Sequence, residues 1–130
     1  MNSERRERAR IDLSNFGISV PIGYIWLIRQ DIMGFDPDSR LEPWFLLESS
    51  ESFDVTERWP NGPLDNTLIS FARRYDCDDI ACFEVCDRRV CSIVVIQGWY
   101  DGSYLVLNTY NTFWDWIKSV IDDIAQILDP

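Results

Sequence analysis

Residues 68–97 read LISFARRYDCDDIACFEVCDRRVCSIVVIQ, and this stretch decides the fold. Leu68–Tyr75 and Asp79–Val85 alternate between apolar and polar residues, which predicts two strands. Val90–Gln97 is apolar at consecutive positions, a pattern typical of a central strand that is covered on both faces. Asp87-Arg88-Arg89 is a tight connection, so the second and third strands are expected to form an antiparallel hairpin.

The pattern continues towards the C-terminus with a loop, a strand and a helix. Gly98–Ser103 is the expected loop, and Tyr104–Thr109 is the expected fourth strand. Asn111 or Thr112 is suited to cap the helix that follows. We expect an apolar stripe on this helix to cover the sheet, formed by Phe113, Trp116, Ile117, Val120, Ile121, Ile124 and Leu128.

The N-terminal half gives weaker signals. Pro21–Gln30 favours a helix, although its aromatic and β-branched residues are nearly as compatible with a strand. Trp44–Glu48 is read as a short strand, and Ser50–Arg58 as a short helix or a loop. The prediction is an α+β fold in which an antiparallel sheet of about four to six strands is covered by N- and C-terminal helices. Residues 13–130 would form a single domain.

The composition excludes several classes of function. The 130-residue chain has 12 basic and 22 acidic residues, so its formal net charge is −10. Because phosphate binding needs a basic surface, this charge argues against direct binding of nucleic acid and fits a cationic partner. The absence of histidine removes Ser-His-Asp triads, Cys-His dyads and histidine metal ligands. We expect a protein that is not an enzyme and uses no cofactor.

Residues 1–12 form a basic arm without the apolar stretch of a signal peptide. Four arginines against two glutamates give residues 1–10 a charge of +2, which leaves −12 on the other 120 residues. We interpret the arm as a flexible, frayed or solvated helical start, with contact to RNA or an acidic partner as the alternative. Apolar runs are too short to span a membrane, and we expect a soluble cytoplasmic protein.

The cysteines lack the paired C-x2-C spacing of a zinc ribbon. In a reducing compartment we interpret them as small buried apolar residues, with a metal site and a redox pair as the alternatives. The four residues are Cys77, Cys82, Cys86 and Cys91.

Acidic and aromatic residues are the candidates for a binding surface. Asp76, Asp78 and Asp79 are read as turn residues, as an acidic contact patch or as ligands for Ca²⁺ or Mg²⁺. Aromatic residues outside the core stripes either anchor an interface or complete the rim of the core; they are Trp44, Trp59, Trp99, Tyr100 and Trp114. The residues selected for protein contact are Glu48, Glu51, Asp76, Asp78, Asp79, Trp99, Tyr100 and Asp101.

Several short segments together carry a resemblance to a known family. They are Ser70-Phe71-Ala72-Arg73, Asp78-Asp79-Ile80-Ala81-Cys82-Phe83, Val94-Val95-Ile96 and Thr112-Phe113-Trp114-Asp115-Trp116-Ile117, with a fainter match at Pro21-Ile22-Gly23-Tyr24. In this pattern the chain resembles the SUKH superfamily over residues 68–128. The glycine-rich turn often seen before the aspartate strand of that family is replaced here by Arg73–Cys77.

The resemblance implies an α+β domain without catalytic residues. Bacterial members of the family are mostly immunity proteins that neutralise polymorphic toxins, commonly nucleases, including those of contact-dependent inhibition systems. A nuclease presents a basic surface to nucleic acid, and an acidic protein is attracted to that surface. We therefore predict a non-enzymatic immunity protein for a basic toxin. The alternatives are an adaptor or regulatory module that binds a different protein, and a small hydrolase or metal-binding protein. The oligomeric state is left open.

Overall fold

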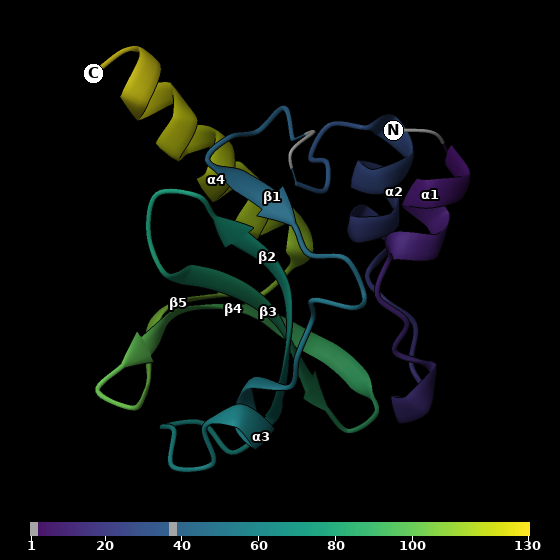
Figure 1. The fold of residues 1–130 in the computed structure, drawn as a ribbon, viewed down its shortest axis with the longest axis vertical. Helices are drawn as coiled ribbons and strands as arrows, with labels where there is room; N and C mark the ends of the chain where they lie inside the picture. The colour runs from purple at the N-terminus through teal and green to yellow at the C-terminus, as the bar shows by residue number, and fades with distance from the viewer. Residues whose placement is uncertain (1–2, 37–38) are drawn as a thin grey trace.

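The computed structural model describes residues 3–36 and 39–130 (Figure 1). The helices are α1 (Ser3–Ala9), α2 (Ile22–Gln30), α3 (Val55–Arg58) and α4 (Phe113–Leu128), with a 3-10 turn, η1 (Ser14–Phe16). The strands are β1 (Trp44–Leu46), β2 (Thr67–Arg74), β3 (Asp79–Cys86), β4 (Arg89–Tyr100) and β5 (Ser103–Tyr110). They form one antiparallel sheet in the order β1-β2-β3-β4-β5, and helices lie at both ends of the chain, so the predicted α+β fold is confirmed.

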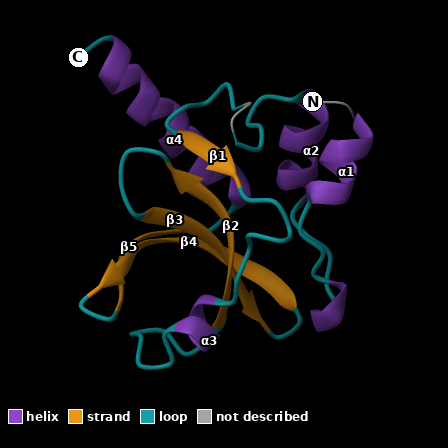
Figure 2. Ribbon diagram, viewed as in Figure 1, coloured by secondary structure: helices purple, strands orange, loops and turns teal. Residues whose placement is uncertain are grey.

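The sheet divides the apolar core into two parts, with α1, α2 and α4 on one side and α3 on the other (Figure 2). On β4, Ile93 and Val95 belong to the larger part, whereas Val94 and Ile96 belong to the smaller one. Because alternate side chains of a strand point to opposite faces, an uninterrupted apolar run is needed to fill both parts. The interpretation of this segment as a central, covered strand is confirmed.

Aromatic rings form the centre of the larger core. The rings of Phe71 on β2 and Phe83 on β3 stack with their centroids 4.1 Å apart. Tyr24 of α2 meets both rings edge-on, at 6.0 and 5.3 Å. Tyr24, Leu27 and Ile28 are buried at helical spacing, so this segment is a helix and not the alternative strand.

The end of the N-terminal segment is part of this core. Ala9 and Ile11 are buried, and the backbone N–H of Ile11 donates to the Tyr24 hydroxyl over 2.9 Å. The backbone N–H of Ser49 donates to the carbonyl of Ala9 over 2.7 Å. The predicted boundary between the arm and the domain, after residue 12, therefore lies inside the packed domain. Ile11, which precedes this boundary, has a buried side chain and a hydrogen-bonded backbone amide.

Three predicted elements have different bounds. The strand expected at Trp44–Glu48 ends at Leu46, and the helical part of Ser50–Arg58 begins only at Val55, after the Asp54 cap. The loop expected over Gly98–Ser103 is mostly strand, since β4 continues to Tyr100. Only Asp101 and Gly102 form the turn, and both have positive φ, at 50° and 73°. Asp-Gly is a favoured pair for such a two-residue hairpin turn.

The cysteines differ from the prediction. Cys82 is buried in the smaller core, whereas Cys77 is exposed. Cys86 and Cys91 form a disulfide across the β3–β4 hairpin. The register of the hairpin explains why these two cysteines meet. Cys91 lies between the Glu84–Ser92 and Val85–Val90 pairs, where the ladder is irregular. The interpretation as buried apolar residues thus holds fully for Cys82 alone.

Candidate protein-binding surface

Two turns that are distant in sequence meet at one end of the sheet. The backbone N–H of Gly98 donates to the carbonyl of Asp78 over 3.0 Å, and Asp79 pairs with Gln97 in the β3–β4 ladder. The β2–β3 turn and the β4–β5 hairpin consequently lie on the same side of the molecule, at the left of Figure 1. We call the resulting set the sheet-end surface; its members are Asp76, Asp78, Asp79, Trp99, Tyr100 and Asp101.

Trp99 and Tyr100 are the aromatic members of this surface. Their side chains are 47% and 46% exposed. The Trp99 ring contacts the buried Trp59 ring edge-on at 5.5 Å, and the Arg73 guanidinium lies 4.8 Å from the centroid of the Trp99 ring. Trp99 is thus anchored on one side by packing and by a cation–π contact, while its other side faces solvent.

The backbone at Trp99 adopts an unfavourable conformation. Its φ is 53°, and the β4–β5 register shifts between Gln97 and Tyr100. A bulky side chain in the left-handed region is uncommon and costs about 1–3 kcal/mol, and such strain often occurs at functional positions. The bulge aims the indole at Trp59 and Arg73 instead of continuing the alternation of the strand.

The carboxylates of the surface differ in their environments. Arg74 donates from Nε to Oδ1 and from Nη2 to Oδ2 of Asp76, both over 2.8 Å, and these bonds lower the pKa of the Asp76 carboxyl. Burial raises the pKa of the half-buried Asp79 carboxyl. Asp78 and Asp101 are exposed. The charge of this region is negative, because the four aspartates outnumber the adjacent Arg73 and Arg74.

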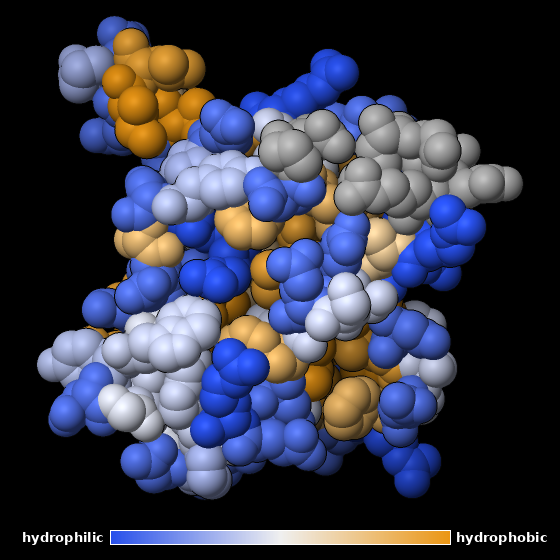
Figure 3. Space-filling model, viewed as in Figure 1, coloured by the Kyte–Doolittle hydropathy of each residue, from blue (hydrophilic) through white to orange (hydrophobic). Residues whose placement is uncertain are grey.

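Helix α4 extends this surface in a way that the sequence analysis missed. Phe113, Trp116, Ile117 and Val120 are buried as predicted, but Ile121 is 51% and Leu128 is 78% exposed. Figure 3 shows the apolar surface gathered where α4 projects from the body, at the upper left. The sequence contained a signal for this exposed apolar surface. The apolar stripe runs the full length of the 16-residue helix, but only the first half of the helix packs against the sheet.

The projecting half of α4 lies close to the β2–β3 turn. Arg74 Nη1 is 3.9 Å from Asp123 Oδ2, so the same guanidinium contacts both elements. An open groove of about 520 Å³ lies there, lined by Arg74, Asp122, Asp123, Gln126 and Ile127. The sheet-end surface is therefore continuous with an acidic and apolar groove.

Glu48 and Glu51 do not belong to this surface. They lie in the loop after β1, which runs back along the middle of β2, where Leu47 N–H donates to the Phe71 carbonyl. Glu48 lines a small groove with Arg8 and Ala9 at the end of α1. Two of the tryptophans considered as interface anchors are buried: Trp44 lies in the larger core and Trp59 in the smaller one. Trp114 is 43% exposed.

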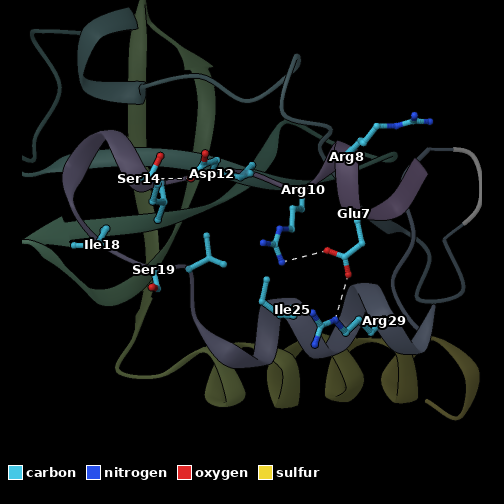
Figure 4. A pocket seen from close by; sticks show the side chains of 12 residues that line it. Glu7, Arg8, Arg10, Asp12, Ser14, Ile18, Ser19, Ile25 and Arg29 are labelled. Atoms are coloured by element: carbon cyan, nitrogen blue, oxygen red, sulfur yellow. Dashed lines mark hydrogen bonds and ion pairs between the residues drawn. The ribbon is translucent and has the colours of Figure 1, made fainter. Parts of the chain in front are cut away.

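A second groove, of about 610 Å³, lies between α1 and α2 and the segment that joins them (Figure 4). Its charges are mixed and mutually paired: Glu7 contacts Arg10 at 3.3 Å and Arg29 at 3.2 Å. The Asp12 carboxylate accepts a hydrogen bond from the Ser14 backbone, which lowers the pKa of that carboxyl. The lining holds three arginines against two acidic residues, so the groove fits a strongly cationic partner less well than the sheet-end surface does.

Within residues 3–36 and 39–130, the group of acidic and sulfur side chains close enough to hold a metal ion is Glu84, Cys86 and Cys91. The aspartates at 76, 78 and 79 do not form such a group. Over the same residues, every helix is too short or too polar to cross a membrane.

Comparison of the chain with family models, with curated proteins and with solved structures gave no match. The resemblance to the SUKH superfamily thus rests on the residues quoted above.

Proposed function

We propose that the chain is a non-enzymatic immunity protein that binds and neutralises a basic protein toxin, a nuclease of a contact-dependent inhibition or polymorphic toxin system. The observation that carries this proposal is the sheet-end surface. It combines the half-exposed rings of Trp99 and Tyr100 with the outward carboxylates of Asp78 and Asp101. Partly exposed aromatic residues among charges are typical of the residues that contribute most to protein–protein binding.

Charge supports a cationic partner. The net charge of −10 attracts a basic protein over distances of about the Debye length, roughly 8–10 Å at physiological salt. Such attraction mainly raises the association rate, and salt weakens it. A surface that occupies the basic groove of a nuclease would also exclude its nucleic acid, so stoichiometric binding is sufficient for neutralisation.

The direct test is co-expression with a basic toxin domain taken from the genes that neighbour the gene for this chain. Cells that produce the toxin domain should grow when this chain is present and die when it is absent. Equal death with and without the chain would contradict the proposal. A tight complex with a protein that is neither toxic nor basic, and whose stability salt does not change, would instead favour an adaptor module.

Matched substitutions test the surface itself. Trp99→Ala should weaken toxin binding at least tenfold, whereas Trp114→Ala, which removes an equally exposed indole elsewhere, should leave binding unchanged. Asp78→Lys should slow association, and Asp65→Lys, which makes the same charge change on another exposed loop, should do so much less. Equal effects of the paired variants would rule out the sheet-end surface as the contact region.

A further inference from the structure

The β3–β4 hairpin gathers side chains that bind soft metal ions. Glu84 and Cys86 lie on β3 and Cys91 lies on β4, and their ligand atoms are all within 4.8 Å of one another. All three residues are half-buried. The disulfide joins the two sulfurs in this structure, so in this oxidised form neither sulfur is available to a metal.

The spacing between Glu84 and Cys91 matches that of two ligands in a tetrahedral site. With Zn–S near 2.3 Å and Zn–O near 2.0 Å, an oxygen and a sulfur on one zinc ion lie about 3.5 Å apart. Cys91 Sγ is 3.6 Å from Glu84 Oε1. The Cα atoms of Cys86 and Cys91 are 5.8 Å apart, which leaves room for the sulfurs to separate by rotation of the side chains alone.

Neighbouring polar side chains complete the arrangement. The Asn66 amide lies 3.6 Å from Cys86 Sγ and 3.3 Å from Glu84 Oε2. A half-turn of this amide directs its oxygen towards Cys86 and Glu84, where it can serve as a fourth ligand. Ser92 Oγ donates to Glu84 Oε1 over 2.6 Å and orients the carboxylate, as outer residues of metal sites do.

We propose that reduction of the Cys86–Cys91 disulfide converts this hairpin into a binding site for one Zn²⁺ ion. Reduction adds two electrons and two protons and turns the disulfide into two thiols. A thiol reductant supplies both and becomes a disulfide, whereas a phosphine supplies the electrons and water supplies the protons and the oxygen of the phosphine oxide. Zinc then binds both sulfurs as thiolates and displaces their two protons, while Glu84 supplies a carboxylate oxygen. Thiolate ligands favour Zn²⁺ over Ca²⁺ or Mg²⁺, which prefer oxygen alone. The inference is independent of the proposed immunity function.

Cobalt is the probe for the test, because a tetrahedral Co²⁺ site with thiolate ligands has intense visible and near-ultraviolet bands. The full chain is reduced with a water-soluble phosphine, which becomes its oxide with oxygen from water, and is then titrated with Co²⁺ without oxygen. We expect one equivalent to bind, with sulfur-to-cobalt charge-transfer bands that Zn²⁺ abolishes. The unreduced chain should show none of these bands.

Variants identify the ligands. Cys86→Ser and Cys91→Ser each remove one of the two thiolates, so each should reduce the charge-transfer band and weaken the affinity by more than tenfold. Cys77→Ser, at the exposed free thiol, should change neither the band nor the affinity. Glu84→Gln should weaken binding more than Ser92→Ala, for which about tenfold is expected. Circular dichroism of each reduced variant shows whether it is folded.

The proposal is overturned if the reduced folded chain gives no charge-transfer band. It is also overturned if Cys77→Ser removes the band, or if Glu84→Gln binds Co²⁺ as tightly as the unsubstituted chain.

Discussion

The guanidinium of Arg74 joins the β2–β3 turn to helix α4. It donates two hydrogen bonds of 2.8 Å to the Asp76 carboxylate, and its Nη1 lies 3.9 Å from Asp123. The Arg74 side chain is only 17% exposed, whereas Asp76 and Asp123 are 52% and 57% exposed. One largely covered cation therefore contacts two carboxylates that face solvent and links the sheet-end surface to the groove beside α4.

The coupling between Arg74 and Asp76 can be measured with a double-mutant cycle of Arg74→Met and Asp76→Asn. Two-pronged charge-assisted bonds are the stronger kind, but solvent screens this exposed carboxylate, so we expect about 0.5–1 kcal/mol from urea unfolding at pH 7. Because the folded state lowers the pKa of the Asp76 carboxyl, the coupling should be lost as pH falls through that folded pKa. The same cycle on the more exposed Glu7–Arg29 pair should give a smaller coupling energy. Equal coupling energies for the two pairs would contradict the expectation that the Arg74–Asp76 pair is the stronger one.

Asp79→Asn should raise the melting temperature at pH 7. Burial raises the pKa of the Asp79 carboxyl, and the nearby Asp76 and Asp78 carboxylates add to the effect, while Cys77 and Arg74 oppose it. The ionised carboxylate thus costs stability in the folded state, and this cost disappears as pH falls through the folded pKa towards the unfolded value of about 3.9. Thermal unfolding at pH 7 and near pH 4 checks the prediction. A lower melting temperature at pH 7 would show that the Asp79 contacts outweigh its desolvation.

Tyr24→Phe tests the docking of the N-terminal segment. The substitution keeps the ring contacts with Phe71 and Phe83 but leaves the buried N–H of Ile11 without its acceptor. We expect a loss of about 1–3 kcal/mol in the free energy of unfolding and faster amide exchange around Ile11. Tyr100→Phe, at an exposed hydroxyl, is the control and should change stability little. Unchanged exchange at Ile11 would mean that the segment is not held by this bond.

Trp99→Asn should separate binding from folding. Asparagine accepts the left-handed conformation that Trp99 adopts at φ 53°, so relief of backbone strain offsets part of the lost contact with Trp59 and Arg73. We expect the stability in urea to change by less than about 1.5 kcal/mol, within the range of a surface residue that loses a partial contact. Toxin binding measured by calorimetry should fall at least tenfold. A variant that binds normally would exclude the indole as an anchor.

Reduction of the Cys86–Cys91 disulfide should destabilise the fold only moderately. The bond closes a short loop, with a sequence separation of 5, for which chain entropy predicts about 2 kcal/mol. Urea unfolding of Cys86→Ser compared with Cys77→Ser measures this difference, since Cys77 is a free thiol. If the hairpin binds zinc as inferred above, Zn²⁺ should restore part of the loss in the reduced unsubstituted chain but none in Cys86→Ser.

Most of the fold could be predicted because it depends on local pattern. The uninterrupted apolar run of β4 and the first half of the stripe on α4 coincide with buried positions, which made these two elements predictable. β2 and β3 were predicted as strands from an alternating pattern, but both are buried at consecutive positions because the sheet is covered on both faces. The Asp54 cap of α3 and the Asp-Gly turn after Tyr100 are equally local signals, and they account for the bounds of α3 and β4 that the sequence analysis placed differently.

The binding surface was only partly predictable. Asp76, Asp78, Asp79, Trp99, Tyr100 and Asp101 were selected from two separate segments, and the antiparallel register brings them together through the Gly98–Asp78 hydrogen bond. Glu48 and Glu51 were selected for the same charge but lie in the loop after β1, which runs back along β2 and brings Glu48 beside the end of α1. Charge and residue type carry no information about which loops meet.

The sequence by itself determined the α+β class, the acidic net charge and the absence of histidine chemistry, because these depend on composition and on periods of two and 3.6 residues. Only the tertiary structure decided which apolar and sulfur side chains are buried. Trp59 is covered by the fold around it, whereas Ile121 and Leu128 lie beyond the part of α4 that the sheet accepts. The pairing of Cys86 with Cys91 depends on a register shift in the β3–β4 ladder. Register and coverage arise from contacts between distant segments, so local patterns do not encode them.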